Sequence, residues 1–243
     1  MKLYPPPGQL GPRAIAEWGL RTQTASVVVD GREHVPARGP VMLVARHFHH
    51  LLDGAVLVTR IARPIHIVVG LDWAATPRQR VWMERMCRAA EYPIVLRRPT
   101  LDGSSVYRRD ELVRYTRAAL RETTRLLRAG RVVLVFPEGY PNVDPSGSRK
   151  RDGADWLPFE PGFLKMIALA ERDGGAEVTV LPVGFRYERA ARWSIHARIG
   201  WPLGREERDL AAIEASVRRL SFAPAGAAGA GLDGPVFAAS RVR

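Results

Sequence analysis

The stretch that decides the fold is VMLVARHFHHLLD, residues 41–53, and VVLVFPEG, residues 132–139, follows the same pattern. In both, an apolar run of strand length ends abruptly in polar and ionisable residues. Such runs are typical of buried strands, and in α/β proteins the reactive side chains emerge where a strand ends and a helix begins. The two stretches therefore predict two core strands with a functional site at their carboxyl ends.

The rest of the chain alternates strand and helix patterns. Strands are expected at residues 25–29, 65–69, 92–96, 178–184 and 194–199, the last at an edge of the sheet. Helices are expected at residues 13–20, 51–59, 78–90, 110–127, 162–170 and 205–220. This alternation predicts a layered α/β domain, with a mostly parallel mixed sheet flanked by helices.

The length of 243 residues suits one α/β domain with modest additions. We expect an N-terminal lead with a short helix over residues 1–24 and the main domain over residues 25–222. Residues 223–243 are rich in Ala and Gly and predict a flexible tail.

The net charge of +12 comes almost entirely from arginine, since only three of the 37 basic residues are lysines. Such a charge is typical of proteins that bind nucleic acid, anionic membranes or phosphorylated small molecules. It equally fits an arginine-rich genome, so charge alone selects no function. The single cysteine, Cys87, excludes an internal disulfide framework and a cysteine-rich zinc site, and it fits a reducing compartment.

Neither a secretory signal nor a membrane span is predicted. The first residues lack an apolar signal core, and Arg60 and Arg63 interrupt the most apolar stretch. We therefore expect a cytoplasmic protein that is soluble or peripherally bound to a membrane.

Three of the six histidines, His47, His49 and His50, lie just before Asp53. A carboxylate beside a histidine orients the imidazole and stabilises its protonated form, which makes the histidine a better general base. From the residues alone, any of the three histidines can be that base. No serine or cysteine nucleophile is needed if the substrate is already an activated ester.

Four blocks in this order resemble the glycerolipid acyltransferases, the family of lysophosphatidate and glycerol-3-phosphate acyltransferases that use acyl-CoA or acyl carrier protein. They are residues 41–53 with the His…Asp motif, the arginine-bearing strand end at 94–98, Phe-Pro-Glu-Gly at 136–139 and the Leu-Pro-Val strand at 181–184. The lead-in at residues 29–40 also fits. The resemblance covers about residues 26–200 and implies the family's fold and a role in phospholipid biosynthesis.

The resemblance also implies roles for single residues. His47 is the general base and Asp53 its partner, with five residues between them, as in one branch of the family. Arg97 or Arg98, together with Glu138 and Gly139, would bind the acceptor, because a guanidinium can hold a phosphate through two hydrogen bonds. A structural role for Glu138, holding an arginine, is the alternative. Apart from the acyl thioester co-substrate, no cofactor and no metal are expected.

The predicted helix at residues 78–90 sets Val81, Trp82 and Met86 among arginines that include Arg78 and Arg85. Such a basic amphipathic face suits an anionic membrane surface, with help from the basic loop at residues 149–151. The alternative is an ordinary surface helix whose apolar stripe packs on the core.

The function expected is therefore transfer of a fatty acyl group from acyl-CoA or acyl carrier protein to a hydroxyl of a glycerol phosphate or lysophospholipid. Three other functions stay open: acylation of a non-phosphorylated alcohol, lipid binding without catalysis, and a metal-dependent hydrolase with His47, His49 and Asp53 as ligands. A nucleic-acid partner is not expected, because aromatics do not interleave with the basic runs. The sequence does not fix the acceptor, the acyl length, the donor carrier or the oligomeric state.

Overall fold

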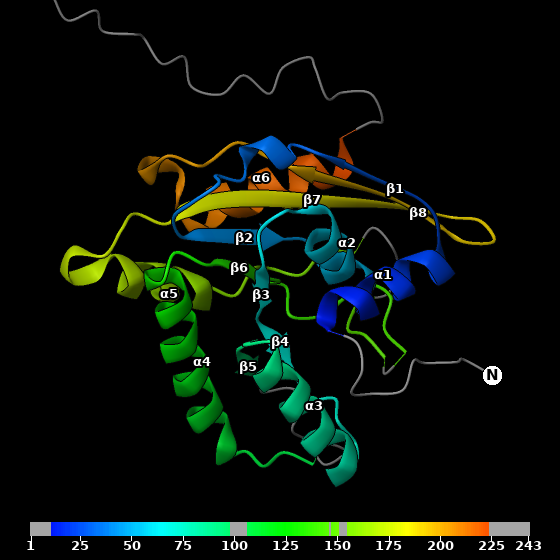
Figure 1. Ribbon diagram of the computed structural model, residues 1–243, viewed down its shortest axis with the longest axis horizontal. Coiled ribbons are helices and arrows are strands. Elements are labelled where there is room, and N and C mark those ends of the chain that lie inside the picture. The colour runs from blue at the N-terminus through cyan, green and yellow to red at the C-terminus, as the bar shows by residue number, and fades with distance from the viewer. Residues whose placement is uncertain (1–10, 98–105, 146, 151–154, 224–243) are drawn as a thin grey trace, which may run out of the picture.

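The computed structural model describes residues 11–97, 106–145, 147–150 and 155–223. Its centre is a six-stranded sheet in the order β1-β8-β7-β2-β6-β3, flanked by helices (Figure 1). All neighbouring strands run parallel except β7 and β8, which form an antiparallel hairpin. The predicted α/β class with a mostly parallel mixed sheet is therefore confirmed. The strands are β1 (Thr24–Asp30), β2 (Val41–Ala45), β3 (Ile65–Ile67), β6 (Val132–Val135), β7 (Thr179–Arg189) and β8 (Trp193–Ile199).

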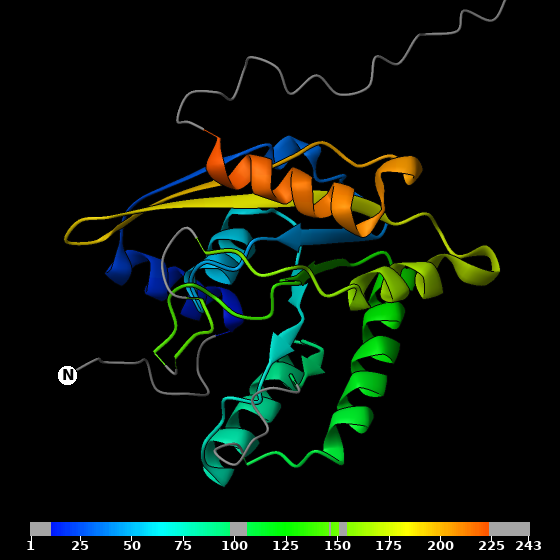
Figure 2. The same ribbon diagram turned by 180° about the vertical axis from the view of Figure 1, so that it is seen from behind.

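Strands β2 and β6 lie at the centre of the core, and every residue in both is buried. Successive side chains of β2 point to opposite faces of the sheet: Leu43 packs in the cluster with α1 and α2, and Met42 in the one with α4, α5 and α6. Helices on both faces explain why these strands are apolar throughout rather than alternating. Figure 2 shows α6 lying across β7. The helices are α1 (Pro12–Gln23), α2 (Leu52–Arg60), α4 (Glu111–Arg128), α5 (Gly162–Glu171) and α6 (Leu210–Phe222).

A smaller lobe projects from this sheet (Figure 1). It contains α3 (Pro77–Ala89), one end of α4 and a two-stranded parallel sheet of β4 (Val69–Gly70) and β5 (Ile94–Val95). The strand predicted at residues 65–69 is thus divided, because Val68 N–H still bonds to Leu134 of the main sheet whereas Val69 N–H bonds to Pro93. The strand predicted at residues 92–96 is reduced to β5.

Two further sequence predictions are corrected near the C-terminus. Strand β8, at residues 193–199, lies between β1 and β7 rather than at an edge, because β1 pairs with its outer side. The helix predicted over residues 205–220 begins later: a short 3₁₀ turn, Arg205–Glu207, precedes α6. The Asp209 carboxylate accepts a hydrogen bond from Ala212 N–H (2.8 Å) and caps the first turn of α6.

Helix α3 packs on the lobe through Met83 and Cys87, not through the stripe proposed from the sequence. Val81 and Trp82 are 48% and 45% exposed. The core of the lobe lies along the side that carries Met83 and Cys87, residues four apart and thus on one helical face. The alternative in which Trp82 packs into the core is therefore wrong. None of the helices in the described part of the chain is long and apolar enough to cross a bilayer.

The predicted helix at residues 13–20 corresponds to α1. Residues 1–10 and 224–243 lie outside the described residues. The predicted division at residues 24/25 and 222/223 stays a prediction.

Candidate active site

The turn that follows β2 brings His47 against Asp53, which occupies the first turn of α2. His47 Nδ1 lies 3.0 Å from Asp53 Oδ2. The same oxygen accepts hydrogen bonds from the backbone N–H groups of Phe48 (2.7 Å) and His49 (2.9 Å). An ionised carboxylate can only accept, so Nδ1 of a neutral His47 carries the proton and Nε2 keeps its lone pair. This is the tautomer that a general base needs.

The His47 ring is held in place and still reachable. It stacks on Phe136, with 4.3 Å between ring centroids. Its side chain keeps 15% of its surface exposed, whereas Asp53 is buried. A substrate can therefore reach the imidazole while the carboxylate behind it stays shielded from water.

Tyr187 on β7 is a site residue that the sequence reasoning missed. Its hydroxyl donates to Asp53 Oδ1 (2.6 Å), and its ring stacks on Phe48. Burial, reinforced by the Asp53 charge, raises the pKa of Tyr187 well above its usual value. The phenol therefore stays protonated and remains a donor. No local pattern could reveal this contact, because 134 residues separate the partners.

The other two histidines have different contacts. His49 is buried, and its Nδ1 accepts the backbone N–H groups of Leu51 and Leu52 (3.3 Å each) at the start of α2. Burial lowers the pKa of His49 to about 4, so its ring is neutral at pH 7. His50 is exposed, and its Nδ1 bonds to the carbonyl of Val143 (3.2 Å). Of the three, His47 is the one whose ring meets Asp53.

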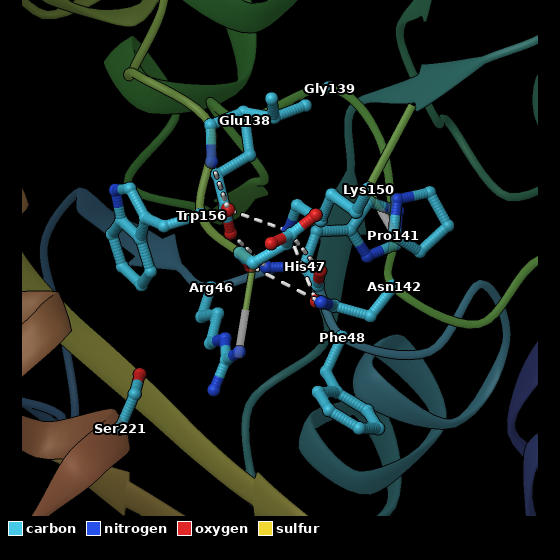
Figure 3. A network of polar contacts seen from close by, with 12 residues as sticks. Arg46, His47, Phe48, Glu138, Gly139, Pro141, Asn142, Lys150, Trp156 and Ser221 are labelled. Carbon is cyan, nitrogen blue, oxygen red and sulfur yellow. Dashed lines mark hydrogen bonds and ion pairs between the residues drawn. The ribbon is translucent and has the colours of Figure 1, made fainter. Parts of the chain in front are cut away.

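Glu138 and Lys150 hold the backbone of His47 (Figure 3). Glu138 Oε1 accepts His47 N–H (2.8 Å), and Oε2 pairs with Lys150 Nζ (2.5 Å) and accepts Leu157 N–H (3.2 Å). Lys150 Nζ in turn donates to the carbonyl of His47 (2.8 Å) and to Asn142 Oδ1 (3.2 Å). Both side chains of the pair are buried.

The Glu138–Lys150 pair departs from two expectations drawn from the sequence. Glu138 holds a lysine rather than an arginine, and it contacts His47 through the backbone. Lys150, expected in a basic surface loop at residues 149–151, is buried against His47; burial lowers its pKa, and the Glu138 charge opposes that shift. The loop's third residue, Arg151, lies outside the described residues. An isolated lysine in a polar loop gives no local signal of such burial.

Arg97 lies at the end of β5, beside Gly139. Its Nε and one terminal nitrogen each lie 2.9 Å from a carboxylate oxygen of the buried Asp72, and the other terminal nitrogen donates to the carbonyl of Gly139. The guanidinium lies over the ring of Tyr140, 4.1 Å from its centroid. Gly139 has φ 71°, a left-handed conformation that favours glycine. Arg98 lies outside the described residues.

Arg46, which directly precedes His47, points away from the site. It is buried over the rings of Phe222 (4.6 Å) and Phe48 (5.3 Å), and burial lowers its pKa, with Glu138 and Asp53 opposing that shift. It packs α6 against the end of β2.

The metal-ligand alternative finds little support in this geometry. The Nδ1 atoms of His47 and His49 face a carboxylate and backbone N–H groups, respectively. In residues 11–97, 106–145, 147–150 and 155–223, no group of three His, Cys, Asp or Glu side chains is arranged to hold a metal ion.

The family model described as Acyltransferase matches residues 26–186, well over half of the chain. The chain therefore belongs to the acyltransferase family, and the sequence-based prediction of that family is confirmed. The structure is similar to the crystal structure of the 1-acyl-sn-glycerophosphate (LPA) acyltransferase PlsC from Thermotoga maritima, with a TM-score of 0.55 and 19% identity. The match covers 85% of this chain and 75% of that chain, and at this identity it concerns the fold. No curated protein sequence matches this chain significantly.

Proposed function

We propose that the protein transfers a fatty acyl group from an acyl thioester, acyl-CoA or acyl carrier protein, to a hydroxyl of a glycerol phosphate or lysophospholipid. The observation that carries the proposal is the contact of His47 Nδ1 with the buried Asp53 carboxylate at the end of β2. Membership of the acyltransferase family and the fold shared with PlsC, a 1-acyl-sn-glycerophosphate acyltransferase, support it.

The reaction needs one base and no protein nucleophile. His47 Nε2 removes the proton of the acceptor hydroxyl as its oxygen attacks the thioester carbonyl. The carbon–sulfur bond then breaks, and the imidazolium returns the proton to the departing thiolate. Asp53 holds the ring and stabilises its positive charge. The thiol of Cys87 takes no part: it is buried in the lobe, and burial raises its pKa to about 12.

The acceptor would lie on the side of His47 formed by Arg97, Glu138 and Gly139. Arg97 already forms an ion pair with Asp72, so a phosphate there would accept from the remaining N–H groups of the Arg97 guanidinium. Arg98 follows directly in sequence and could add the further charge that a phosphate needs. Glu138 acts through the backbone of His47 rather than on the acceptor itself.

We further propose that the enzyme meets its lipid at an anionic membrane surface, through the exposed face of α3. Val81 and Trp82 are exposed on this helix, and Arg78 and Arg85 form no ion pair within the described residues. Basic residues beside aromatic ones suit the headgroup region of such a membrane.

The test is acyl transfer from palmitoyl-CoA and palmitoyl-carrier protein to glycerol 3-phosphate, lysophosphatidate, a zwitterionic lysolipid and a non-phosphorylated monoacylglycerol. Thioester-dependent ester formation with a phosphate-bearing acceptor is expected. Equal rates with the non-phosphorylated alcohol would overturn the acceptor class, and thioester hydrolysis without any acceptor product would overturn transfer itself.

A further inference from the structure

A cavity of about 840 Å³ opens beside the turn that carries His47. Four segments form its walls: the carboxyl half of α1, the turn around His50, the turn around Asp144, and the β7–β8 hairpin. Figure 1 shows α1, α2 and this hairpin at the same end of the molecule. The lining residues on which the argument rests are Trp18, His49, Leu51, Arg189, Arg192 and Trp193. Neither Arg97 nor Gly139 is among the residues that line it.

The chemistry of this cavity is amphipathic. Trp18, Leu51 and Trp193 give it apolar surface. At the hairpin, Arg189 and Arg192 are exposed, and neither forms an ion pair with a carboxylate in the described part of the chain. The guanidinium of Arg189 lies 4.6 Å from the ring centroid of Trp193, so an indole and a cation form one surface. A ligand with an apolar or amide-bearing chain and an anionic end fits this surface.

The position of the cavity relates it to the reaction. His49, two residues beyond His47, is part of its wall, whereas the proposed acceptor residues lie elsewhere. The transfer proposed above needs two substrates that reach His47 together, and a separate cavity whose wall includes His49 offers room for the second one.

We propose that this cavity binds the phosphopantetheine arm of the acyl donor, with the phosphate on Arg189 and Arg192 and the pantetheine chain against Trp18 and Trp193. The inference rests on the proposed function, since the donor is the thioester of that reaction. Acyl-CoA and acyl carrier protein both present this arm, so the chemistry is common to the two donors. The size of the cavity is in the range of ordinary ligand sites.

The test measures binding without turnover. Tryptophan fluorescence of the full chain is titrated with coenzyme A, with 4′-phosphopantetheine and with pantetheine, which lacks the phosphate. The variant is Arg189→Ala with Arg192→Ala. Its matched control is Arg121→Ala with Arg172→Ala, which removes two exposed arginines from a separate basic groove between α4 and α5.

Losing the two guanidiniums should weaken the binding of coenzyme A and of phosphopantetheine about tenfold, as expected for lost charge-assisted hydrogen bonds. Pantetheine should bind weakly to wild type and variant alike, and the control variant should bind as wild type does. In turnover, the KM for the donor should rise about tenfold in the Arg189/Arg192 variant, with the KM for the acceptor unchanged. Equal affinity for coenzyme A and phosphopantetheine would indicate that the shared arm suffices, and tighter coenzyme A binding would point to CoA as the donor.

If coenzyme A and phosphopantetheine bind equally weakly to both double variants, the effect is general electrostatic attraction and the inference is overturned. A raised KM for the acceptor instead of the donor would also overturn it, while acyl transfer would stand. Phosphate-dependent binding at Arg189 and Arg192 without any acyl transfer would leave the site standing and overturn the proposed function.

Discussion

At the scale of single residues, the site depends on two sets of buried residues that hold different parts of His47. Asp53, with Tyr187 behind it, holds the ring, and the Glu138–Lys150 pair holds the backbone. The ring and the main chain of His47 are thus fixed by different parts of the protein. Each part can be weakened separately.

Tyr187→Phe removes the hydroxyl that donates to Asp53 and keeps the ring that stacks on Phe48. The fold should persist and kcat should fall about tenfold, because one hydrogen bond to a charged group no longer positions Asp53. The control is Tyr107→Phe, which removes a tyrosine hydroxyl bonded to Glu84 in the separate lobe. Steady-state kinetics that change equally in the two variants would contradict the positioning role.

Lys150→Met leaves the buried Glu138 carboxylate without its cation. Removing one partner of a buried ion pair should lower the free energy of unfolding by about 3–5 kcal/mol, measured by urea denaturation. Adding Glu138→Gln to Lys150→Met should recover part of that loss, since no charge is then left buried. A Lys150→Met variant as stable as wild type would show that the Glu138–Lys150 pair is not buried as described.

At the scale of elements, the start of α2 depends on a neutral His49, whose Nδ1 accepts two backbone N–H groups. Burial lowers the pKa of His49 to about 4, below its ordinary value of 6.5. Because the unfolded chain takes up this proton at higher pH than the folded one, stability is complete above pH 6.5 and falls as the pH drops toward 4. The free energy of unfolding lost on protonation of His49 is on the order of 3 kcal/mol.

The expected result is a lower urea midpoint at pH 5 than at pH 7. In His49→Asn the amide oxygen can still accept a backbone N–H, but nothing titrates at this position, so the drop between the two pH values should be smaller. Identical drops in wild type and His49→Asn would show that another group governs the acid sensitivity.

Helix α3 tests the membrane proposal. Wild type should co-sediment with anionic liposomes at low salt and much less at high salt, because basic residues contribute about 1 kcal/mol each near such a surface and salt screens them. Trp82→Ala with Arg85→Ala should reduce the bound fraction, whereas Trp201→Ala, at an exposed tryptophan whose ring lies tilted against that of His34, should not. Equal binding to neutral and anionic vesicles would contradict electrostatic docking.

At the scale of the whole molecule, the strand order gathers the site. Strands β7, β2 and β6 are adjacent and parallel, so their carboxyl ends bring Tyr187, His47 and Glu138 to one edge of the sheet. These residues come from segments up to 140 positions apart in the chain, and only the topology unites them.

The sequence predicted what depends on local pattern. The apolar runs before His47 and Glu138 are the buried strands β2 and β6. The residues alone placed three histidines near Asp53, and only the family resemblance singled out His47, whose Nδ1 the structure places 3.0 Å from Asp53. Contacts that depend on the topology, such as those of Tyr187 with Asp53 and of Lys150 with His47, were not predicted. The sequence left two alternatives for Trp82, exposed or packed on the core, because both faces of α3 carry apolar residues and only packing selects one.

The central claim, that His47 is the base of acyl transfer, is tested most directly by kcat for thioester-dependent transfer in His47→Ala, beside His50→Ala as the matched control. The account predicts a loss of about 10²–10⁴-fold in His47→Ala, the range typical of a lost general base, with an unchanged circular dichroism spectrum. His50→Ala should keep near wild-type activity, since its ring meets a backbone carbonyl rather than Asp53. Near wild-type turnover in His47→Ala, with activity lost in His49→Ala or His50→Ala, would contradict it.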